Sequence, residues 1–287
     1  MPNFSEGRNA ETVEAIRSAI VATPGVVLLR SERDPDHNRS VMTFAGSPEA
    51  VLDAAFHAVR HAQKSIDLTR HRGVHPRIGA ADVVPFVPVE NVTLDDCVRL
   101  ARRLGDRVWS ELRVPVYFYE AAALHPDRVN LENARRGGFE KPNLPPDLGG
   151  PALHPTAGAC VIGARKFLIA FNVNLNTPDV AVANSIARKI RASSGGLPFV
   201  KAIGVLLESR NLAQVSINLT DFEQTGLHMV FHRVKQEAEA LGVTIAGSEI
   251  IGLIPKKALE MVAAEALQIE NFSSDLVLEN RLSSSPL

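Results

Sequence analysis

Cysteine, tryptophan, tyrosine and net charge are all scarce in this sequence. Of its 287 residues, two are cysteine, one is tryptophan and two are tyrosine. Two cysteines exclude a disulfide framework and a thiolate zinc site, and they favour a reducing compartment. A formal net charge of -1 provides no general attraction to nucleic acids or anionic membranes. Any anion-binding site must therefore come from local clustering of arginine and lysine.

Long apolar runs are missing as well. No segment approaches the roughly 18 consecutive apolar residues that a membrane-spanning helix needs, and residues 1–6 lack the basic and then apolar pattern of a secretory signal. The sequence thus predicts a cytoplasmic protein that binds neither membranes nor nucleic acids. Apolar residues make up 45% and charged residues 22% of the chain, a balance typical of globular proteins with a core of normal size.

Helix-like and strand-like patterns alternate along the chain. Helical spacing of apolar residues occurs over 9–22, 48–66, 93–112, 178–192, 223–241 and 256–267, and strand-like runs occur over 26–29, 41–44, 83–89, 115–119, 199–207, 213–219 and 243–254. Because strands come in adjacent pairs between helices, this order favours an α+β fold with mixed or antiparallel sheets covered by helices, in the split β-α-β, or ferredoxin-like, arrangement. The pattern restarts in the second half, so we predict two subdomains, 1–176 and 177–287.

Three stretches stand out from this alternation. Residues 121–157 hold many prolines and the run Arg-Arg-Gly-Gly, which predicts a long ordered loop, and long loops in compact domains are usually functional or disordered. Residues 159–175 are almost continuously apolar and are interpreted as one extended strand. The prolines within 83–89 predict a strand that lies at a sheet edge or bends.

The densest group of reactive side chains lies at 70–77. Three arginines and two histidines occur within these eight residues, interrupted by Gly73 and Pro76, which exclude a continuous helix. A histidine whose ordinary pKa is about 6.5, placed among arginines, suits an anionic substrate that must also exchange a proton. We interpret the segment as a loop that carries proton-transfer chemistry; a solvated basic loop is the alternative.

A second candidate segment lies at 158–166. Small residues are followed there by two cations: Gly158, Ala159, Gly163, Ala164, Arg165 and Lys166. The small residues allow a flat ligand to approach the backbone. The Gly-Lys-Ser/Thr sequence of a phosphate-binding loop is lacking, so a nucleotide site is not expected. From composition alone, a turn before a buried strand fits equally well.

Other polar residues give weaker signals. Asn172 and Asn174 alternate within an apolar run, so both point to one face of a strand, where they either orient a ligand or satisfy neighbouring backbone groups. The polar turn at 34–39 contains Asn38 and Arg39, in a sequence common among turns. Histidines four residues apart occur at 57/61, 71/75 and 228/232, but without an HExxH motif or a carboxylate cluster beside the first pair, so no metal site is predicted.

Together, these segments resemble the glutamate formiminotransferase family. The resemblance rests on PNFSEGR at 2–8, DHNRS at 36–40, HRGVHPRIGA at 71–80, the stretch 158–174, SSGGLP at 193–198 and QVSINLTD at 214–221. It covers nearly the whole chain. It is to the free-standing microbial form, because the chain is too short to hold the cyclodeaminase half that follows this domain in animals.

The resemblance implies a folate-dependent enzyme of histidine degradation and one-carbon metabolism. Such an enzyme transfers the formimino group of N-formimino-L-glutamate to its co-substrate tetrahydrofolate, giving 5-formiminotetrahydrofolate and glutamate, without a metal. It also implies a homodimer whose protomers hold folate in an electropositive tunnel between their two subdomains, and a separate cyclodeaminase that takes the product. The alternatives are formyl transfer between N-formyl-glutamate and 5-formyltetrahydrofolate, folate binding without catalysis, and an interaction scaffold.

The resemblance also assigns roles to residues. The catalytic histidine of the family's HxGxHPR motif falls on His75, and we expect Glu32 to stabilise the cationic amidine of the donor. Substrate or folate is expected to contact Asn38, Arg39, Arg72, Arg77, Gly158, Ala159, Gly163, Ala164, Arg165, Lys166, Asn172 and Asn174. The chain departs from the family in two ways: the usual short strand before Pro-Asn-Phe-Ser is lacking, and Arg30 stands where an aspartate is common.

Overall fold

The computed structural model describes residues 1–74, 76–270, 272–278 and 280. It divides the chain into two compact units, Met1–Phe167 and Leu168–Leu287. The boundary predicted at 176 lay too far along the chain, because the strand β7 (Ile169–Leu175) pairs with strands of the second unit. The apolar run 159–175 is accordingly not one extended strand. It forms β6 (Cys160–Ala164) in one sheet and β7 in the other.

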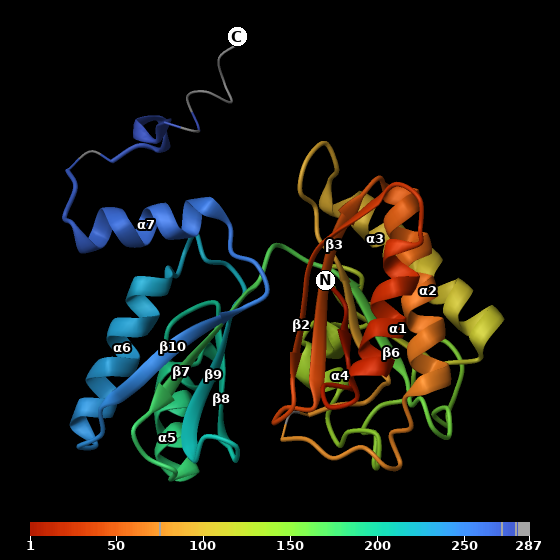
Figure 1. The fold of residues 1–287 in the computed structure, drawn as a ribbon, viewed down its shortest axis with the longest axis horizontal. Coiled ribbons are helices and arrows are strands. Elements are labelled where there is room, and N and C mark those ends of the chain that lie inside the picture. Colours follow the sequence, from red (N-terminus) through yellow and green to blue (C-terminus); the bar gives the residue numbers. More distant parts are fainter. Residues whose placement is uncertain (75, 271, 279, 281–287) are drawn as a thin grey trace. The chain divides into compact units, whose positions relative to one another are not determined.

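The first unit is built on a six-stranded mixed sheet with the strand order β2-β3-β1-β4-β6-β5 (Figure 1). The bounds of the remaining strands are β1 (Asn3–Phe4), β2 (Val26–Asp34), β3 (Arg39–Gly46), β4 (Ala81–Phe86) and β5 (Val116–Glu120). β1 pairs antiparallel with both β3 and β4, whereas β4, β6 and β5 run parallel. The amino ends of β3 and β4 therefore lie at the same edge of the sheet.

Three helices cover one face of this sheet: α1 (Ala10–Val21), α2 (Pro48–Ser65) and α3 (Leu94–Arg107), which continues as the π-helical turn η1 (Val108–Leu112). Their apolar sides pack with alternate residues of the strands into one core. Asn9 caps α1 by accepting from two backbone N–H groups, and Thr93 forms a capping box with Asp96 at the start of α3. Among the described residues, no helix combines the length and the hydrophobicity that crossing a membrane requires.

The strand β4 lies inside the sheet, between β1 and β6, and every one of its residues is buried. The predicted edge position was therefore wrong. Pro85 is tolerated because β1 pairs only at Ala81 and Val83, with a register shift between them, and has ended before Pro85.

The loop 121–157 covers part of the opposite face of the first sheet. It contains η2 (Pro126–Arg128) and α4 (Leu131–Ala134), and its apolar side chains pack against Ile78, Val83, Tyr117, Tyr119, Ala159 and Val161. The Tyr117 hydroxyl donates to the Leu144 carbonyl at 2.6 Å. The prediction of a long ordered loop is thus confirmed.

The second unit is a four-stranded antiparallel sheet with the order β10-β7-β9-β8. Its other elements are α5 (Val180–Ile190), η3 (Ala192–Ser194), β8 (Val200–Leu207), β9 (Leu212–Leu219), α6 (Leu227–Ala240), β10 (Ile245–Ile251), α7 (Lys256–Ala266) and η4 (Ser274–Leu276). The run β7-α5-β8-β9-α6-β10 with this order is the predicted split β-α-β arrangement. The run β1-α1-β2-β3-α2-β4 has the same spatial order, β2-β3-β1-β4, before β6 and β5 extend the first sheet. The second half therefore repeats the architecture of the first.

Candidate functional site

The basic motif lies in the loop between α2 and β4, at the amino end of β4. His75 itself lies outside the described residues, whereas the residues on either side of it are described. The loop rests on the turn between β2 and β3. The Asn38 amide donates to the Arg72 carbonyl at 3.0 Å and accepts from the Gly7 N–H at 2.9 Å, and the Val74 N–H donates to the Asp36 carbonyl at 3.4 Å. Asn38, expected to bind substrate, therefore uses its buried side chain to join two loops and the chain near Gly7.

His71 is held in one protonation state by its neighbours. The Arg77 Nε–H donates to His71 Nδ1 at 2.8 Å, so Nδ1 must be unprotonated, and the proton on Nε2 points to the Asn38 carbonyl at 2.9 Å. Burial lowers the pKa of His71, and the charge of Arg77 adds to this, although the bond to Asn38 opposes it. A neutral histidine with both nitrogens engaged is poorly suited to proton transfer, which favours His75 for that role.

Arg77 already holds a carboxylate. Its guanidinium donates to both carboxylate oxygens of Glu140, at 2.7 and 3.2 Å, and its Nε is taken by His71. The pKa of Glu140 is lowered by its hydrogen bond to Arg77. A substrate carboxylate could bind this pair of Arg77 NH groups only by displacing Glu140, whose side chain is largely exposed.

Arg39 is also engaged inside the protein. Its guanidinium donates to the Asp82 carboxylate at 2.8 Å and to the Asn3 side chain at 3.1 Å. The Arg39 side chain is 11% exposed and that of Asp82 is wholly buried. Arg39 thus joins β3 to β1 and β4, and its bonds to Asp82 and Asn3 leave few guanidinium N–H groups for a ligand.

Glu32 lies on the face of β2 opposite the helices, because it pairs in register with Val41, whereas the neighbouring Ser31 pairs with the core residue Met42. It forms an ion pair with Arg30 of the same strand. Arg30, which departs from the family pattern, therefore partly neutralises the carboxylate that we expect to stabilise a cationic amidine. Glu32 lies near the end of β2, at the same sheet edge as the motif loop.

The small residues of 158–166 are packed inside the first unit. Gly158, Ala159, Gly163 and Ala164 are all buried. A Cβ on Gly158 would meet the Ile78 carbonyl oxygen at 2.0 Å, and one on Gly163 would meet the Tyr119 ring at 2.4 Å. Their small size is thus explained by contacts within the protein, and their expected contact with folate stays a prediction.

Arg165 and Lys166 lie far from the motif loop. They follow the carboxyl end of β6, whereas the motif precedes β4, which runs parallel to β6. The length of β4 separates the two edges by roughly 17 Å. Of the five cations expected to contact substrate or folate, Arg72 and Arg77 therefore lie at one end of the parallel strands and Arg165 and Lys166 at the other.

The second unit carries a polar cluster on the face of its sheet opposite the core side chains. The Gln214 amide donates to Asn174 Oδ1 and to the Glu249 carboxylate, both at 2.8 Å, and Asn172 donates to the same carboxylate oxygen at 3.3 Å. Gln214 is wholly buried, and its Oε1 has no hydrogen-bond partner among the described residues. Gln214 and Glu249 were not predicted as site residues from the sequence, although Gln214, Ser216 and Asn218 alternate within β9 just as the two asparagines do within β7.

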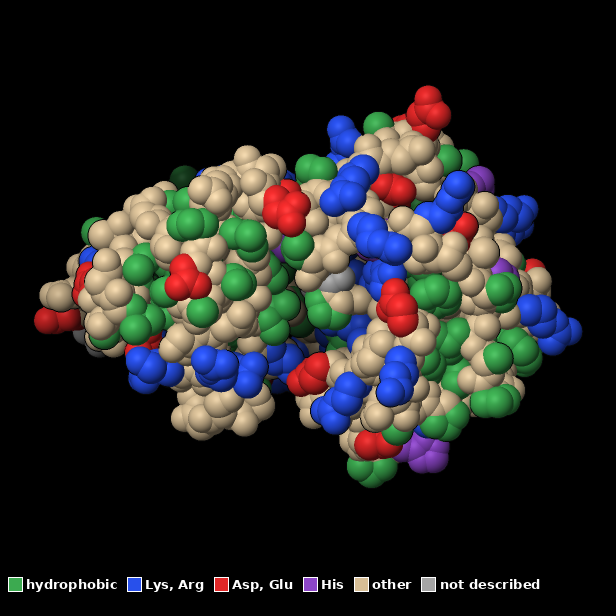
Figure 2. All heavy atoms as spheres, turned by 90° about the horizontal axis from the view of Figure 1, so that it is seen from below, with side chains coloured by type: hydrophobic (Ala, Val, Ile, Leu, Met, Phe, Trp, Pro, Cys, Tyr) green, Lys and Arg blue, Asp and Glu red, His purple; other side chains and the backbone are tan. Residues whose placement is uncertain are grey.

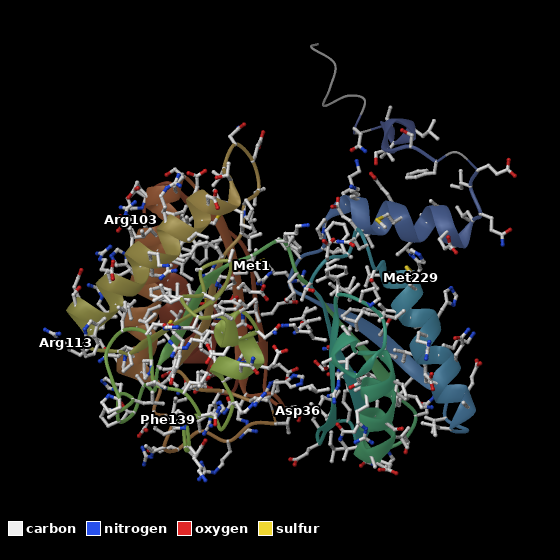
Figure 3. All side chains as sticks on the ribbon, turned by 180° about the vertical axis from the view of Figure 1, so that it is seen from behind. Met1, Asp36, Arg103, Arg113, Phe139 and Met229 are labelled. Carbon is white, nitrogen blue, oxygen red and sulfur yellow. The ribbon has the colours of Figure 1, made fainter. Side chains whose placement is uncertain are left out.

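The segments around the motif gather at one end of the first unit. Figure 3 labels Asp36, in the turn before β3, and Phe139, in the loop 121–157, at this end, whereas Arg103 on α3 lies away from it. The Phe139 N–H donates to the Arg77 carbonyl at 3.2 Å. Seen from this end, Figure 2 shows Lys and Arg side chains with acidic ones among them. Within the described part of the chain, no group of three or more His, Cys, Asp or Glu side chains is arranged to hold a metal ion.

Comparison with known proteins identifies both units. Residues 1–165 match the family model of the formiminotransferase domain, N-terminal subdomain, and residues 170–281 match that of the formiminotransferase domain. The chain is 44% identical to a glutamate formimidoyltransferase of Streptococcus pyogenes serotype M1, over 98% of this chain and 97% of that protein. It is 45% identical to a glutamate formimidoyltransferase of Thermoplasma acidophilum, over 98% of this chain and 96% of that protein. A formimidoyltransferase-cyclodeaminase of Sus scrofa is 46% identical over 94% of this chain, but only 52% of that protein is covered.

Proposed function

Since this chain belongs to the formiminotransferase family, as its motifs predicted, we propose that it transfers the formimino group of N-formimino-L-glutamate to tetrahydrofolate, giving 5-formiminotetrahydrofolate and glutamate. The observation that carries this proposal is the identity of 44% and 45% to two glutamate formimidoyltransferases over nearly the whole length of each chain. The hydrogen bonds made by Arg72, Val74 and Arg77, on either side of His75, support it, because a proton-transfer group needs a defined position.

In the proposed reaction, N5 of tetrahydrofolate attacks the formimino carbon, whose electrophilicity rises when its imino nitrogen is protonated. The N5–C bond forms, N5 loses its proton, and a tetrahedral intermediate results. The bond from this carbon to the glutamate nitrogen then breaks as that nitrogen gains a proton and leaves as an amine. His75 takes the first proton and supplies the second, and such a group typically contributes about 10²–10⁴-fold to the rate.

The surroundings supply charges for both substrates. Glu32 stabilises the protonated amidine, in competition with Arg30. Arg72 binds a carboxylate of the donor, and Arg77 does so when Glu140 is displaced. Arg165 and Lys166 bind a carboxylate of folate at the other sheet edge.

The polar cluster of the second unit suits the pterin ring. Asn172 and Asn174 hydrogen-bond the ring, and Gln214 and Glu249 accept from its N–H groups. The buried oxygen of Gln214, which has no partner within the described part of the chain, supports this assignment, because buried acceptors are normally hydrogen-bonded.

We also propose that the protein is a cytoplasmic homodimer whose product passes to a separate cyclodeaminase. The homodimer is tested by measuring the mass of the purified protein in solution by sedimentation equilibrium. A monomer at micromolar concentration would contradict it.

The test of function follows glutamate release from N-formimino-glutamate in the presence of tetrahydrofolate. We expect the wild type to release glutamate and His75→Ala to release it about 10²–10⁴-fold more slowly. The control His232→Ala, which alters an exposed histidine on α6, should release it at the wild-type rate. Folate binding without release would favour the binding-protein alternative. Turnover of N-formyl-glutamate with no turnover of the formimino compound would favour formyl transfer.

A further inference from the structure

Asp82, in β4, is a wholly buried carboxylate that accepts four hydrogen bonds. Its Oδ1 accepts from the backbone N–H groups of Ile78 and Gly79, at 2.8 and 3.3 Å. Its Oδ2 accepts from the guanidinium groups of Arg39 and Arg135, at 2.8 and 3.0 Å. No surface of this side chain is exposed to solvent.

These donors come from three separate parts of the first unit. Ile78 and Gly79 end the motif loop, Arg39 begins β3, and Arg135 lies in the loop 121–157. Arg135 also donates to the carbonyl of Pro76 at 3.3 Å. Pro76 directly follows His75. The carboxyl-terminal side of the motif is therefore fixed at Ile78 and Gly79 by Asp82, and at Pro76 by Arg135.

The charges make this arrangement costly to disturb. Burial would raise the pKa of Asp82, but Arg39, Arg135 and the backbone N–H groups hold it well below its usual range. The carboxylate therefore stays ionised near neutral pH. Removing its charge would leave two guanidinium groups with little exposure and no carboxylate between them, and breaking a buried ion pair is strongly destabilising.

We propose that Asp82 is a positioning residue of the transfer reaction, which fixes the residues that follow His75 in the motif loop without touching either substrate. This inference rests on the proposed function, since it takes His75 as the proton-transfer group. A displacement of about 1 Å from a productive geometry can cost about 10²-fold in rate. Asp82 therefore acts on kcat and not on the affinity for either substrate.

The first unit offers a matched control in Asp147. Its side chain is also wholly buried and forms an ion pair with Arg128, and it accepts from the backbone N–H of Phe118 at 2.7 Å. It thus joins the loop 121–157 to a strand, as Asp82 does, but its hydrogen bonds do not reach the motif loop. Asp147→Asn therefore reproduces the loss of a buried charge without the loss of positioning.

The experiment compares Asp82→Asn with Asp147→Asn, with kcat and KM expressed per folded molecule. We expect kcat to fall by about 10²-fold in Asp82→Asn, with KM for both substrates within about threefold, and kcat to change by less than about threefold in Asp147→Asn. Amide hydrogen exchange at Ile78 and Gly79 should be faster than in the wild type in Asp82→Asn, and unchanged in Asp147→Asn. Because Asp82 acts through His75, adding Asp82→Asn to His75→Ala should cause no further loss of rate.

Equal kcat values per folded molecule in the two variants would reduce Asp82 to a structural role and overturn the proposal. A further fall in rate on the His75→Ala background would also overturn it. If Asp82→Asn does not fold, Arg135→Met, compared with Arg128→Met, removes one hydrogen bond to Asp82 and the contact with Pro76, and the same expectations apply. A wild type that releases no glutamate would refute the proposed function; hydrogen exchange at Ile78 and Gly79 would then still decide whether Asp82 fixes the loop.

Discussion

Replacing Asn38 by alanine should destabilise the first unit more than an ordinary loop substitution does. The Asn38 side chain is buried, accepts from the Gly7 N–H and donates to the Arg72 carbonyl. Its backbone φ is +47°, in the left-handed region where asparagine is tolerated better than alanine. The substitution removes both hydrogen bonds and places alanine in an unfavourable backbone conformation.

The magnitude follows from these contributions. A buried N–H left without a partner costs about 1–3 kcal/mol, and the lost bond to the Arg72 carbonyl about 0.5–1.5 kcal/mol. The backbone conformation adds about 1 kcal/mol. We therefore expect the free energy of unfolding to fall by about 3 kcal/mol or more, which is large relative to the total stability of a typical domain.

A matched control isolates the hydrogen bonds. Asn91 also has a positive φ, +55°, but is exposed, so Asn91→Ala should cost only the backbone contribution of about 1 kcal/mol. Urea unfolding followed by the fluorescence of Trp109, the single tryptophan of the chain, reports on the first unit. If Asn38→Ala loses no more stability than Asn91→Ala, the inference that Asn38 joins these loops is refuted.

Two further predictions concern His71 and the carboxylate at Arg77. Burial lowers the pKa of His71 below the value of about 6.5 in the unfolded chain, so its contribution to stability is complete above about pH 6.5 and is lost as the pH falls toward the folded pKa. In His71→Gln, the midpoint of urea unfolding should therefore fall less between about pH 7 and pH 5.5 than in the wild type. An equal fall in both proteins would contradict the assignment of a lowered pKa to His71. Glu140→Gln should lower KM for N-formimino-glutamate by up to about fivefold, since an exposed ion pair contributes about 0.2–1 kcal/mol; an unchanged KM would show that the donor does not use Arg77.

The sequence predicted the secondary structure and the fold class well because local signals decide them. The helical spacing of apolar residues marked α1 and α3. Two errors came from information that is not local. Buried strands of two different sheets look alike in sequence, so β6 and β7 were joined into one strand. Whether Pro85 can occupy an inner strand depends on how far β1 extends beside β4, which only the pairing shows.

The same distinction explains which parts of the site were predictable. The composition of the motif marks a basic loop, but it does not show which cations are already neutralised. Arg39 and Arg77 meet their carboxylates across 43 and 63 residues of sequence. Among the described residues, Arg72 donates to the backbone carbonyls of Thr69 and His71 and to no carboxylate. Arg72 therefore keeps its charge available for an anionic substrate, and the positive charge of the loop available to a ligand is smaller than its count of arginines suggests.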